Sequence, residues 1–484
     1  MRGEYRDIGY ADISSFDAKI LTSLTPDLLI ALDPKAKASL GSQLRRQLLD
    51  AIRSGALRKG VRLPSTRALA RQLGVSRPIV LDVYGQLAAE GYLRVRQGAR
   101  PVVDAGRTEQ PFSPPEPEAL NELVRFDLRP AMPDVTMFPR QAWLRATRAA
   151  LNRLPASELG YGDLRGSLNL RRVIADYLGR VRGVIADPGQ IYVTSGFAEG
   201  RALTSVAFHA AGVRRLAVEN PSYSDWIAVD KAGLERVPVP VDDEGLDTER
   251  LAAASAEAVF VTPAHQFPIG GILSAGRRQR LVRWLQERDR FALEDDYDAE
   301  FRYDQAPVGA LQGLAPDHVV YAGTVSKTLA PAMRLGWLVV PPRLVDTMNG
   351  ELRRWSEGPP RIEQEALAEL VETGAYDRHL RRMRRLYRQR RDLLVECIGR
   401  ELPNLKIEGA AAGLHLTLCL PAWVDEKHVL GELRKRGVAT EGLAHYAQTP
   451  LSPARLFLGY GRASEGALRL AVRALADVVG PSGI

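Results

Sequence analysis

The sequence predicts an α/β protein with a small, basic helix-turn-helix unit near its N-terminus. Its 484 residues exceed the length of one typical domain and indicate two or three. From Asp127 onward, short apolar runs alternate with helical patterns, as expected for a mostly parallel sheet covered by helices. Between Lys37 and Asp104, thirteen Lys and Arg residues accompany four acidic ones, so this segment carries a charge of +9 and the rest −1. A basic module attached to a near-neutral larger unit indicates a polyanion-binding function.

The composition excludes several other classes of protein. A hydrophobic content of 45% is ample for a sizeable core. The two cysteines, Cys397 and Cys419, provide neither a disulfide framework nor metal-ligand spacing, so we expect a reducing compartment and no metal site. No apolar run has the length of a membrane span, and the first residues lack an apolar signal core. We therefore expect a soluble, cytoplasmic protein that does not bind membranes.

The basic segment contains three helical patterns. The first begins at Ser39; Ser65 caps a short second helix that Gly74 closes, and Ser76 caps the third. The last two helices are separated by three residues, as in a helix-turn-helix. Two short runs after the third helix can pair as a small β-wing: Tyr92–Val95 and Pro101–Val103.

Residues 63–93, LPSTRALARQLGVSRPIVLDVYGQLAAEGYL, resemble the core of a GntR-type winged helix. The resemblance implies that double-stranded operator DNA is a partner and that four residues lie at the DNA: Ser65, Arg67, Ser76 and Arg77. The alternative is that both arginines are ordinary surface residues. The wing departs from the family pattern, because Gly98-Ala99-Arg100-Pro101 replaces the usual glycine-rich tip with threonine. We therefore expect the helices to contact DNA more than the wing does.

The chain divides into four segments on this evidence. Residues 1–36 are an N-terminal extension, 37–104 the winged helix, 105–126 a Pro- and Glu-rich linker, and 127–484 the large domain. Extended at about 3 Å per residue, the linker spans on the order of 60 Å, enough to place the small domain on a partner subunit.

Strand-like runs of the large domain mostly end in a polar cluster, which is the edge where open α/β sheets bind ligands. The expected strands are Gln190–Thr194, Arg215–Val218, Ala258–Val261, Phe291–Leu293, Val319–Ala322 and Trp337–Val340.

Residues 319–340, VVYAGTVSKTLAPAMRLGWLVV, are the stretch around which the large domain is organised. Apolar runs at both ends predict buried strands, and the polar loop between them carries Thr324, Ser326, Lys327 and Arg334. This set suits a phosphorylated aldehyde, because the amine forms a Schiff base while hydroxyls and guanidinium hold the phosphate. For an isolated Ser-Lys pair, a solvated loop lysine is the alternative.

The pattern GTVSKTLAPAMRLGW resembles the pyridoxal-phosphate lysine signature of fold-type I aminotransferases. Its spacing is most similar to the aminotransferase-like half of MocR/GabR regulators. The resemblance implies a fold-type I domain, pyridoxal 5'-phosphate as cofactor, and Lys327 as the Schiff-base lysine.

An acidic cluster follows the apolar run Phe291–Leu293. Strand alternation predicts Asp295 and Tyr297 on one face, with Asp296 and Asp298 on the other. The stretch EDDYDAEFRY resembles the MocR-type pattern, which implies that Asp295 meets the protonated ring nitrogen and Tyr297 the ring oxygen. The alternative is a capping cluster.

Three further places complete the expected cofactor site. Ser195, Gly196 and Phe197 begin a helix whose backbone amides suit a phosphate. The alternative is an ordinary turn, because a Ser-Gly pair before a helix is common in turns. Tyr223 stands where related aminotransferases carry the ring that stacks on the pyridine; a packed core tyrosine is the alternative. Tyr161 resembles the tyrosine that reaches the neighbouring chain's phosphate, which implies a homodimer.

Two positions depart from the catalytic pattern. Phe267 stands where catalytic relatives carry an asparagine near the ring oxygen. Phe457 stands where aminotransferases have the arginine that grips the substrate carboxylate, and Arg455, on the same strand face, is a candidate to replace it. Both departures weaken the case for efficient transamination.

An arginine-rich run, residues 377–391, predicts a helix with Met383 and Leu386 facing inward. We expect its arginines to form a solvated or ion-paired surface, and a contact with DNA phosphates is the alternative.

Together the two resemblances cover nearly the whole chain after residue 37 and imply a pyridoxal-phosphate-dependent, DNA-binding transcriptional regulator. The hypothesis is that an amine-bearing effector (an amino acid, an ω-amino acid or a B6 vitamer) displaces Lys327 by aldimine exchange and changes the spacing of the DNA-reading helices. We expect a homodimer, head-to-tail with swapped DNA-binding domains, and no enzyme beyond weak residual transamination. The alternatives are a DNA-tethered, catalytically active aminotransferase and a regulator that binds its ligand without the cofactor.

Overall fold

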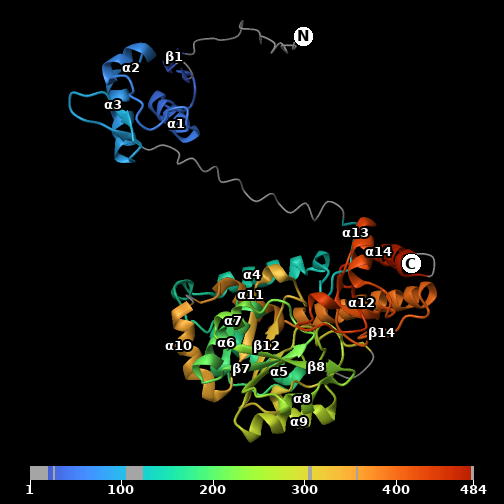
Figure 1. The fold of residues 1–484 in the computed structure, drawn as a ribbon. Coiled ribbons are helices and arrows are strands. Elements are labelled where there is room, and N and C mark those ends of the chain that lie inside the picture. The colour runs from blue at the N-terminus through green and yellow to red at the C-terminus, as the bar shows by residue number, and fades with distance from the viewer. Residues whose placement is uncertain (1–19, 26–27, 105–123, 304–307, 356–357, 481–484) are drawn as a thin grey trace, which may run out of the picture. The chain divides into compact units, whose positions relative to one another are not determined.

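The computed structural model describes residues 20–25, 28–104, 124–303, 308–355 and 358–480. These residues form two compact units, one within residues 1–119 and the other within residues 120–484 (Figure 1). Residues 1–19 of the expected extension and 105–123 of the expected linker lie outside the described residues.

Three helices build the small unit: α1 (Leu40–Ser54), α2 (Thr66–Leu73) and α3 (Arg77–Ala89). The hydroxyls of Ser39 and Ser65 accept backbone N–H groups at the starts of α1 and α2, and Gly74 ends α2 in the left-handed conformation. Ser76 precedes α3 but makes no capping hydrogen bond with its side chain. The apolar stripes of the helices meet in one core that includes Leu44, Leu48, Leu69, Leu73, Val80 and Leu87. The predicted helix-turn-helix is confirmed.

Two short antiparallel pairs complete the small unit. β3 (Leu93–Arg94) pairs with β4 (Val102–Val103), which confirms the expected wing in a shorter form. β1 (Ile20–Thr25) pairs with β2 (Leu28–Leu32), and Ile30 and Leu32 lie in the same core as the helices.

An eight-stranded sheet forms the centre of the large unit, in the order β6-β13-β12-β11-β10-β7-β8-β9. β13 is antiparallel to both of its neighbours and β9 is antiparallel to β8, while the other pairs are parallel. The strands are β6 (Ile191–Thr194), β7 (Arg215–Asn220), β8 (Glu235–Asp242), β9 (Gly245–Leu246), β10 (Ala258–Val261), β11 (Phe291–Asp295), β12 (Val319–Thr324) and β13 (Gly336–Val339). All six expected strands are confirmed to within two residues, whereas β8 and β9 were not predicted.

Helices cover both faces of this sheet because its strands are apolar on both. On β10, Phe260 packs in a core with α6 (Phe197–Ala210), α7 (Ile227–Lys231) and α10 (Val345–Trp355). The next residue, Val261, packs in the core under α8 (Thr248–Ala253) and α9 (Ala275–Glu287). Successive side chains of a strand point to opposite faces, so the same alternation places Asp295 on the α6 side, with Leu293.

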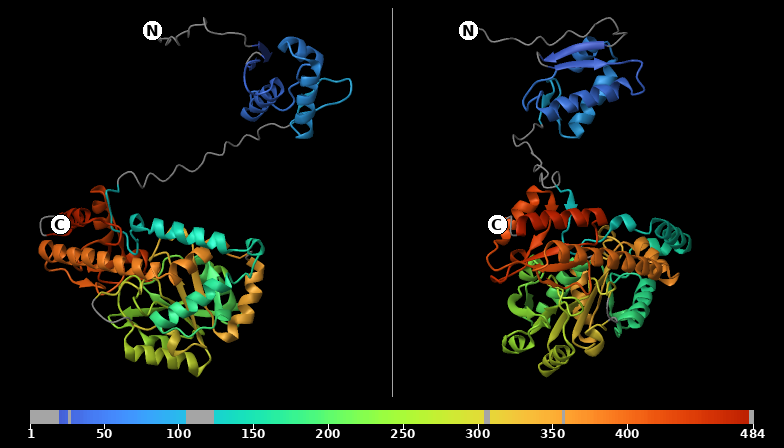
Figure 2. Two further views of the ribbon diagram at one scale, coloured as in Figure 1. Left: turned by 180° about the vertical axis from the view of Figure 1, so that it is seen from behind. Right: turned by 90° about the vertical axis from the view of Figure 1, so that its right-hand side faces the viewer.

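A third core joins the remaining helices to a small antiparallel sheet. The helices are α4 (Arg140–Arg153), α5 (Leu168–Arg182), α11 (Arg361–Glu372), α12 (Ala375–Glu401), α13 (Glu426–Lys435) and α14 (Glu465–Val479). The sheet has the order β14 (Ile407–Glu408), β15 (His415–Cys419), β18 (Arg455–Gly459) and β17 (Glu441–Gly442); β16 (Val438–Ala439) pairs with β5 (Phe126–Asp127). Figure 2 shows α12, α13 and α14, in deeper orange to red, together on one side of the large unit.

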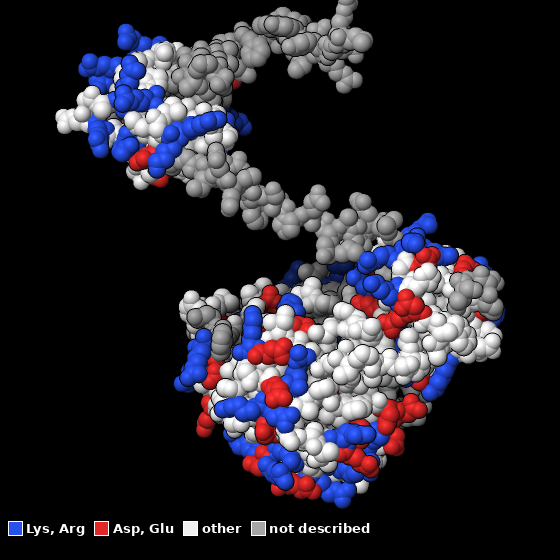
Figure 3. Space-filling model, viewed as in Figure 1, with Lys and Arg blue, Asp and Glu red and all other residues white. Residues whose placement is uncertain are grey.

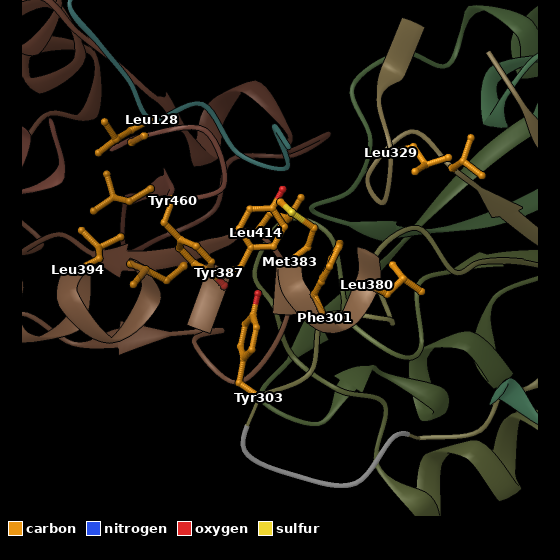
Figure 4. Packing of buried hydrophobic residues seen from close by; sticks show 14 of the residues in the cluster. Leu128, Phe301, Tyr303, Leu329, Leu380, Met383, Tyr387, Leu394, Leu414 and Tyr460 are labelled. Atoms are coloured by element: carbon orange, nitrogen blue, oxygen red, sulfur yellow. The ribbon is translucent and has the colours of Figure 1, made fainter. Parts of the chain in front are cut away.

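The side chains of α12 tie this third core to the segment that follows β11. Figure 4 shows Tyr387 and Met383 pointing toward Phe301, and the rings of Tyr387 and Phe301 meet edge to face with centroids 5.0 Å apart. The inward position of Met383 is confirmed, and Leu386 packs against the same core. On the same helix, Arg390 forms a largely buried ion pair with Asp134.

Candidate cofactor site and nucleic-acid interface

Lys327 lies in the loop between β12 and β13, at the end of the central sheet. The two strands pair antiparallel, with Thr324 opposite Gly336, so the residues between them project from the sheet edge. Burial lowers the pKa of Lys327 from its ordinary value, and this effect outweighs the attraction of Asp298 and Asp295. A lysine with a lowered pKa is more often unprotonated, which is the form that attacks an aldehyde.

Arg334 and the start of α6 form one end of the site. Gly196 has φ +92°, and a β-carbon added to it would lie 3.6 Å from Arg334 Nη1, so the guanidinium lies directly over the start of the helix. Arg334 itself is in the left-handed conformation with φ +47°. In the same loop, the Thr324 hydroxyl donates a hydrogen bond to Ser326 Oγ, 2.9 Å away. The structure thus brings together backbone N–H groups, hydroxyls and a guanidinium, a set suited to a phosphate group.

The first turn of α6 carries one acidic residue, Glu199, that was not predicted. The backbone N–H of Ser195 donates a hydrogen bond to the Glu199 carboxylate. Phe197 and Ala198 of the first turn line the cavity described below.

Asp295 lies deeper, at the carboxyl end of β11. Its Oδ1 atom is buried and accepts no hydrogen bond within the part of the chain that the structure describes. Burial raises the pKa of Asp295 well above its ordinary value, and the nearby Asp296 and Asp298 raise it further. A buried carboxyl group without a partner is suited to share a proton with a pyridine nitrogen.

Tyr223 lies beside this carboxyl group, in the segment after β7. Its ring packs against Phe197 and Phe267, and the guanidinium of Arg201 lies 4.7 Å from the ring centroid. Arg201 is 1% exposed and was not predicted, because nothing in its spacing from Tyr223 indicates the contact.

The alternation expected for the acidic cluster is partly wrong. β11 ends at Asp295, so the chain no longer alternates between faces beyond it. Asp296 does point away from the cavity, where it forms an ion pair with Arg182. Asp298 instead lies on the side of Tyr297: Asp298 Oδ2 and Tyr297 Oη are both 2.9 Å from Nδ1 of His265. His265 was not predicted as a site residue, although it belongs to the stretch TPAHQFPIGG.

The Lys327 loop, the start of α6, Asp295 and Tyr223 all contribute side chains to one cavity of about 500 Å3. Lys327, Asp295, Tyr297, Tyr223, Phe197, Thr324, Ser326 and Arg334 are among its lining residues. A cavity of this size is sufficient for a small organic cofactor. Tyr161, in contrast, is 93% exposed and does not line this cavity.

The opposite wall of the cavity is aromatic. Phe267 lines it and meets Tyr297 and Tyr446 edge to face, and the fully buried Phe457 packs behind Tyr446. Arg455 does not substitute for an arginine in this wall. Its Nε forms an ion pair with Glu408 at 3.2 Å, and it does not line the cavity.

The small unit exposes two groups of arginines. Lys and Arg residues cover much of its visible face, whereas basic and acidic residues alternate on the visible face of the large unit (Figure 3). Arg67, Arg71 and Arg77 line a shallow hollow beside the turn between α2 and α3. The exposed Ser65 and Ser76 stand at the starts of these two helices. Exposed arginines at helix N-termini are suited to DNA phosphates and base edges.

The wing carries a second group of arginines. A hollow of about 500 Å3 is lined by Arg62, Arg94, Arg96 and Arg100, together with Ala99 and Val102. The β3–β4 pairing brings these arginines together from both sides of the wing.

None of the helices in the described ranges is long and apolar enough to span a membrane.

Comparison with known proteins supports two domains. The family "Bacterial regulatory proteins, gntR family" matches residues 40–103, and "Aminotransferase class I and II" matches residues 135–443. Two solved structures share the fold of the large unit: a Pyrococcus horikoshii kynurenine aminotransferase (TM-score 0.66, 24% identity, 73% of this chain and 90% of that chain) and an archaeal alanine:glyoxylate aminotransferase (TM-score 0.66, 22% identity, 73% and 90%).

Curated relatives match both domains at once. The HTH-type pyridoxine biosynthesis transcriptional regulator PdxR of Corynebacterium glutamicum is 35% identical over 471 residues, which cover 94% of this chain and 99% of that protein. The HTH-type transcriptional regulator TauR of Rhodobacter capsulatus is 31% identical, with 94% and 96% covered. The probable rhizopine catabolism regulatory protein MocR of Rhizobium meliloti is 33% identical, with 80% and 83% covered. The chain therefore belongs to the MocR-type transcriptional regulators of the GntR family, in which a helix-turn-helix DNA-binding domain is fused to an aminotransferase class I and II domain.

Proposed function

We propose that this regulator binds pyridoxal 5'-phosphate at Lys327 and senses an amine-bearing effector by aldimine exchange at that residue. The observation that carries the proposal is the convergence of the Lys327 amine, the unpartnered Asp295 carboxyl group and the Arg334 guanidinium on one cavity. When bound, this cofactor supplies an aldehyde that exchanges between amines.

The residues present fit the cofactor from end to end. Asp295, Tyr297 and Tyr223 line the cavity, where Asp295 would be the partner of the ring nitrogen, Tyr297 would donate to the ring oxygen, and Tyr223 would stack on the ring. The Arg334 guanidinium, the hydroxyls of Ser195, Thr324 and Ser326, and the backbone N–H groups of Gly196 and Phe197 would hold the phosphate group, since the backbone N–H of Ser195 already donates to Glu199. A side chain larger than hydrogen at Gly196 would occupy space under Arg334 and strain the backbone at φ +92°.

When the cofactor is bound, Lys327 would hold its aldehyde, and an amine-bearing effector would compete with Lys327 for it. The exchange would need no oxidant or reductant, because one amine replaces another. The lowered pKa of Lys327 supports both directions of the exchange. Amino acids, ω-amino acids and B6 vitamers with an amine are the effector classes, and the PdxR relative, named for pyridoxine biosynthesis, favours a B6 vitamer among them.

The signal passes to double-stranded operator DNA through the small unit. Ser65, Arg67, Ser76 and Arg77 are the proposed DNA contacts, because all four are exposed at the starts of the helix-turn-helix helices. The exposed Tyr161 supports a homodimer in which this residue completes the phosphate site of the partner chain. Swapped, head-to-tail DNA-binding domains are part of the same proposal.

Regulation rather than turnover is the main function in this proposal. Phe267 and Phe457 supply no guanidinium for a substrate carboxylate, Arg455 is held by Glu408, and Arg129, which does line the cavity, is paired with Asp127. The intact Lys327 site is the observation that favours the second candidate, a DNA-tethered aminotransferase. Sustained conversion of an amino donor and a keto acid by the purified protein would establish that second function.

The proposal is tested by measuring operator binding during titration with candidate amines, alongside the absorption spectrum in the same buffer. An effector should change the visible band and the operator affinity over the same concentration range. Lys327→Ala should abolish both responses, whereas the exposed Lys231→Ala should keep them. An unchanged operator response in Lys327→Ala would reject the exchange at Lys327.

A further inference from the structure

Tyr297 belongs to a buried hydrogen-bonded triad. Its other two members, His265 and Asp298, do not line the cavity. His265 comes from the segment after β10, and Asp298 from the segment after β11. Tyr297, His265 and Asp298 are 7%, 2% and 1% exposed. His265 Nδ1 is 2.9 Å from Asp298 Oδ2 and 2.9 Å from Tyr297 Oη. One ring nitrogen thus stands between a carboxylate and a phenol.

The carboxylate determines which ring nitrogen of His265 carries the proton. A carboxylate only accepts hydrogen bonds, so Nδ1 of His265 is the protonated nitrogen and acts as the donor. Nε2 of His265 is then an acceptor, and it has no hydrogen-bond partner within the described residues. The N–H of Nδ1 is shared between Asp298 and the oxygen of Tyr297.

This arrangement orients the hydroxyl of Tyr297. An oxygen that accepts from His265 must point its own hydrogen elsewhere, and Tyr297 lines the cavity next to Lys327. Asp298 competes for this hydroxyl, because it lies within hydrogen-bonding reach of it, and the N–H of His265 occupies Oδ2 of Asp298. Burial, Asp298 and Asp295 together raise the pKa of Tyr297 well above its ordinary value, so its hydroxyl remains a proton donor.

We propose that His265, held in its Nδ1-protonated form by Asp298, aims the Tyr297 hydroxyl at the ring oxygen of the cofactor. His265 and Asp298 are therefore positioning residues that act through Tyr297. This inference rests on the proposed binding of pyridoxal 5'-phosphate at Lys327. A hydrogen bond to the ring oxygen stabilises a negative charge on that oxygen. The triad should therefore lower the pH midpoint at which the visible band of the cofactor-loaded protein changes.

Other charged and titratable groups act on the same centre. They come from four elements packed around the triad: Asp295 at the end of β11, Lys327 after β12, Glu219 on β7 and His415 on β15. His415 remains neutral, because burial lowers its pKa to about 4 and its Nε2–H donates to the Pro268 carbonyl. Variants of His265 must therefore be compared with the Tyr297→Phe variant as well as with the wild type.

The test is a spectral pH titration of the protein loaded with pyridoxal 5'-phosphate. His265→Phe keeps a ring of similar size and removes the donor, and it should raise the midpoint of the visible band by roughly one pH unit. Tyr297→Phe should raise the midpoint in the same direction, and the double variant should show no further rise, because both single variants remove the same hydrogen bond. His265→Asn retains an N–H at the position of Nδ1, so its midpoint should lie close to that of the wild type.

A matched control is His318→Phe, since His318 contacts Arg343 and the Arg290 carbonyl rather than this triad. An unchanged midpoint in His265→Phe would overturn the inference, as would shifts of His265→Phe and Tyr297→Phe that add in the double variant. A wild-type protein that shows no visible band after loading would instead reject the proposed cofactor binding. The two failures are therefore distinguishable.

Discussion

Arg182 and Asp296 form a bidentate ion pair in the interior of the large unit. Nε of Arg182 lies 2.7 Å from Oδ2, Nη2 lies 3.0 Å from Oδ1, and the two side chains are 3% and 2% exposed. Asp296 also accepts a hydrogen bond from Tyr321. The pair anchors the residue that follows Asp295, so it fixes the segment on which the site depends.

The first prediction concerns this pair. Arg182→Met should destabilise the large unit by about 3–5 kcal/mol, because it leaves Asp296 buried without a counter-charge. Arg180→Met, on the same helix, should cost less than about 1 kcal/mol, since its ion pair with Asp377 is exposed. Denaturant unfolding of the two variants provides the comparison, and equal losses would contradict the interpretation.

Asp295 should contribute directly to cofactor affinity. Asp295→Asn removes the only ionisable partner proposed for the ring nitrogen and should weaken binding of pyridoxal 5'-phosphate by about 10- to 100-fold. The exposed Asp243→Asn provides the control for a lost carboxylate in the same unit. Equilibrium titration followed by absorbance measures both, and wild-type affinity in Asp295→Asn would exclude its proposed role.

Tyr161 should act across the dimer. In mixed dimers of Tyr161→Phe and Lys327→Ala chains, one site combines an intact Lys327 with an intact Tyr161 from the other chain. Such dimers should bind the cofactor at one site with wild-type affinity, whereas each variant alone should bind weakly or not at all. If mixed dimers bind no better than Tyr161→Phe alone, Tyr161 does not complete the partner's site.

The turn of the helix-turn-helix should dominate operator binding. Arg77→Ala and Arg67→Ala should each weaken binding, and each lost phosphate contact should reduce the slope of log affinity against log salt by about 1. Arg283→Ala, an exposed arginine of the large unit, should leave both quantities unchanged. Binding measured over a series of salt concentrations distinguishes these variants, and a wild-type slope in both Arg67→Ala and Arg77→Ala would show that neither contacts phosphate.

Glu219 should make the stability of the large unit depend on pH. Burial raises its pKa to about 7, and hydrogen bonds from Thr262 and Gln266 oppose this only partly. In the unfolded chain it ionises near its ordinary pKa of 4.5, so the folded state holds more protons between pH 4.5 and 7. Its contribution to stability is present below pH 4.5 and is lost as the pH rises toward 7.

The corresponding variant is Glu219→Gln, which stays neutral. The difference in melting temperature between Glu219→Gln and the wild type should increase in favour of the variant from pH 5 to pH 8. The exposed Glu235→Gln should show no such trend. A pH-independent difference for Glu219→Gln would mean that Glu219 is ionised in the fold at pH 5.

Much of this architecture was predictable because its signals are local. Capping serines at Ser39 and Ser65 mark helix starts directly, and buried strands such as β10 and β12 appear as apolar runs. β8 was missed because its apolar residues alternate with exposed ones and include two prolines, Pro238 and Pro240, which disfavour a central strand.

The parts that were missed depend on contacts between distant segments. His265 and Asp298 are 33 residues apart, and only the fold brings them to Tyr297. Asp298 was assigned to the wrong face because periodic alternation was extended past the end of β11 at Asp295. In the small unit, the arginines of the wing gather only after β3 and β4 pair.

The most direct measurement is peptide mass analysis after the protein has been loaded with pyridoxal 5'-phosphate and reduced with borohydride. Reduction fixes the cofactor to the amine that held it. The account predicts that the peptide containing Lys327 carries the reduced phosphopyridoxyl group and that Lys327→Ala carries none there. An unmodified Lys327 in the loaded and reduced wild-type protein would contradict the account.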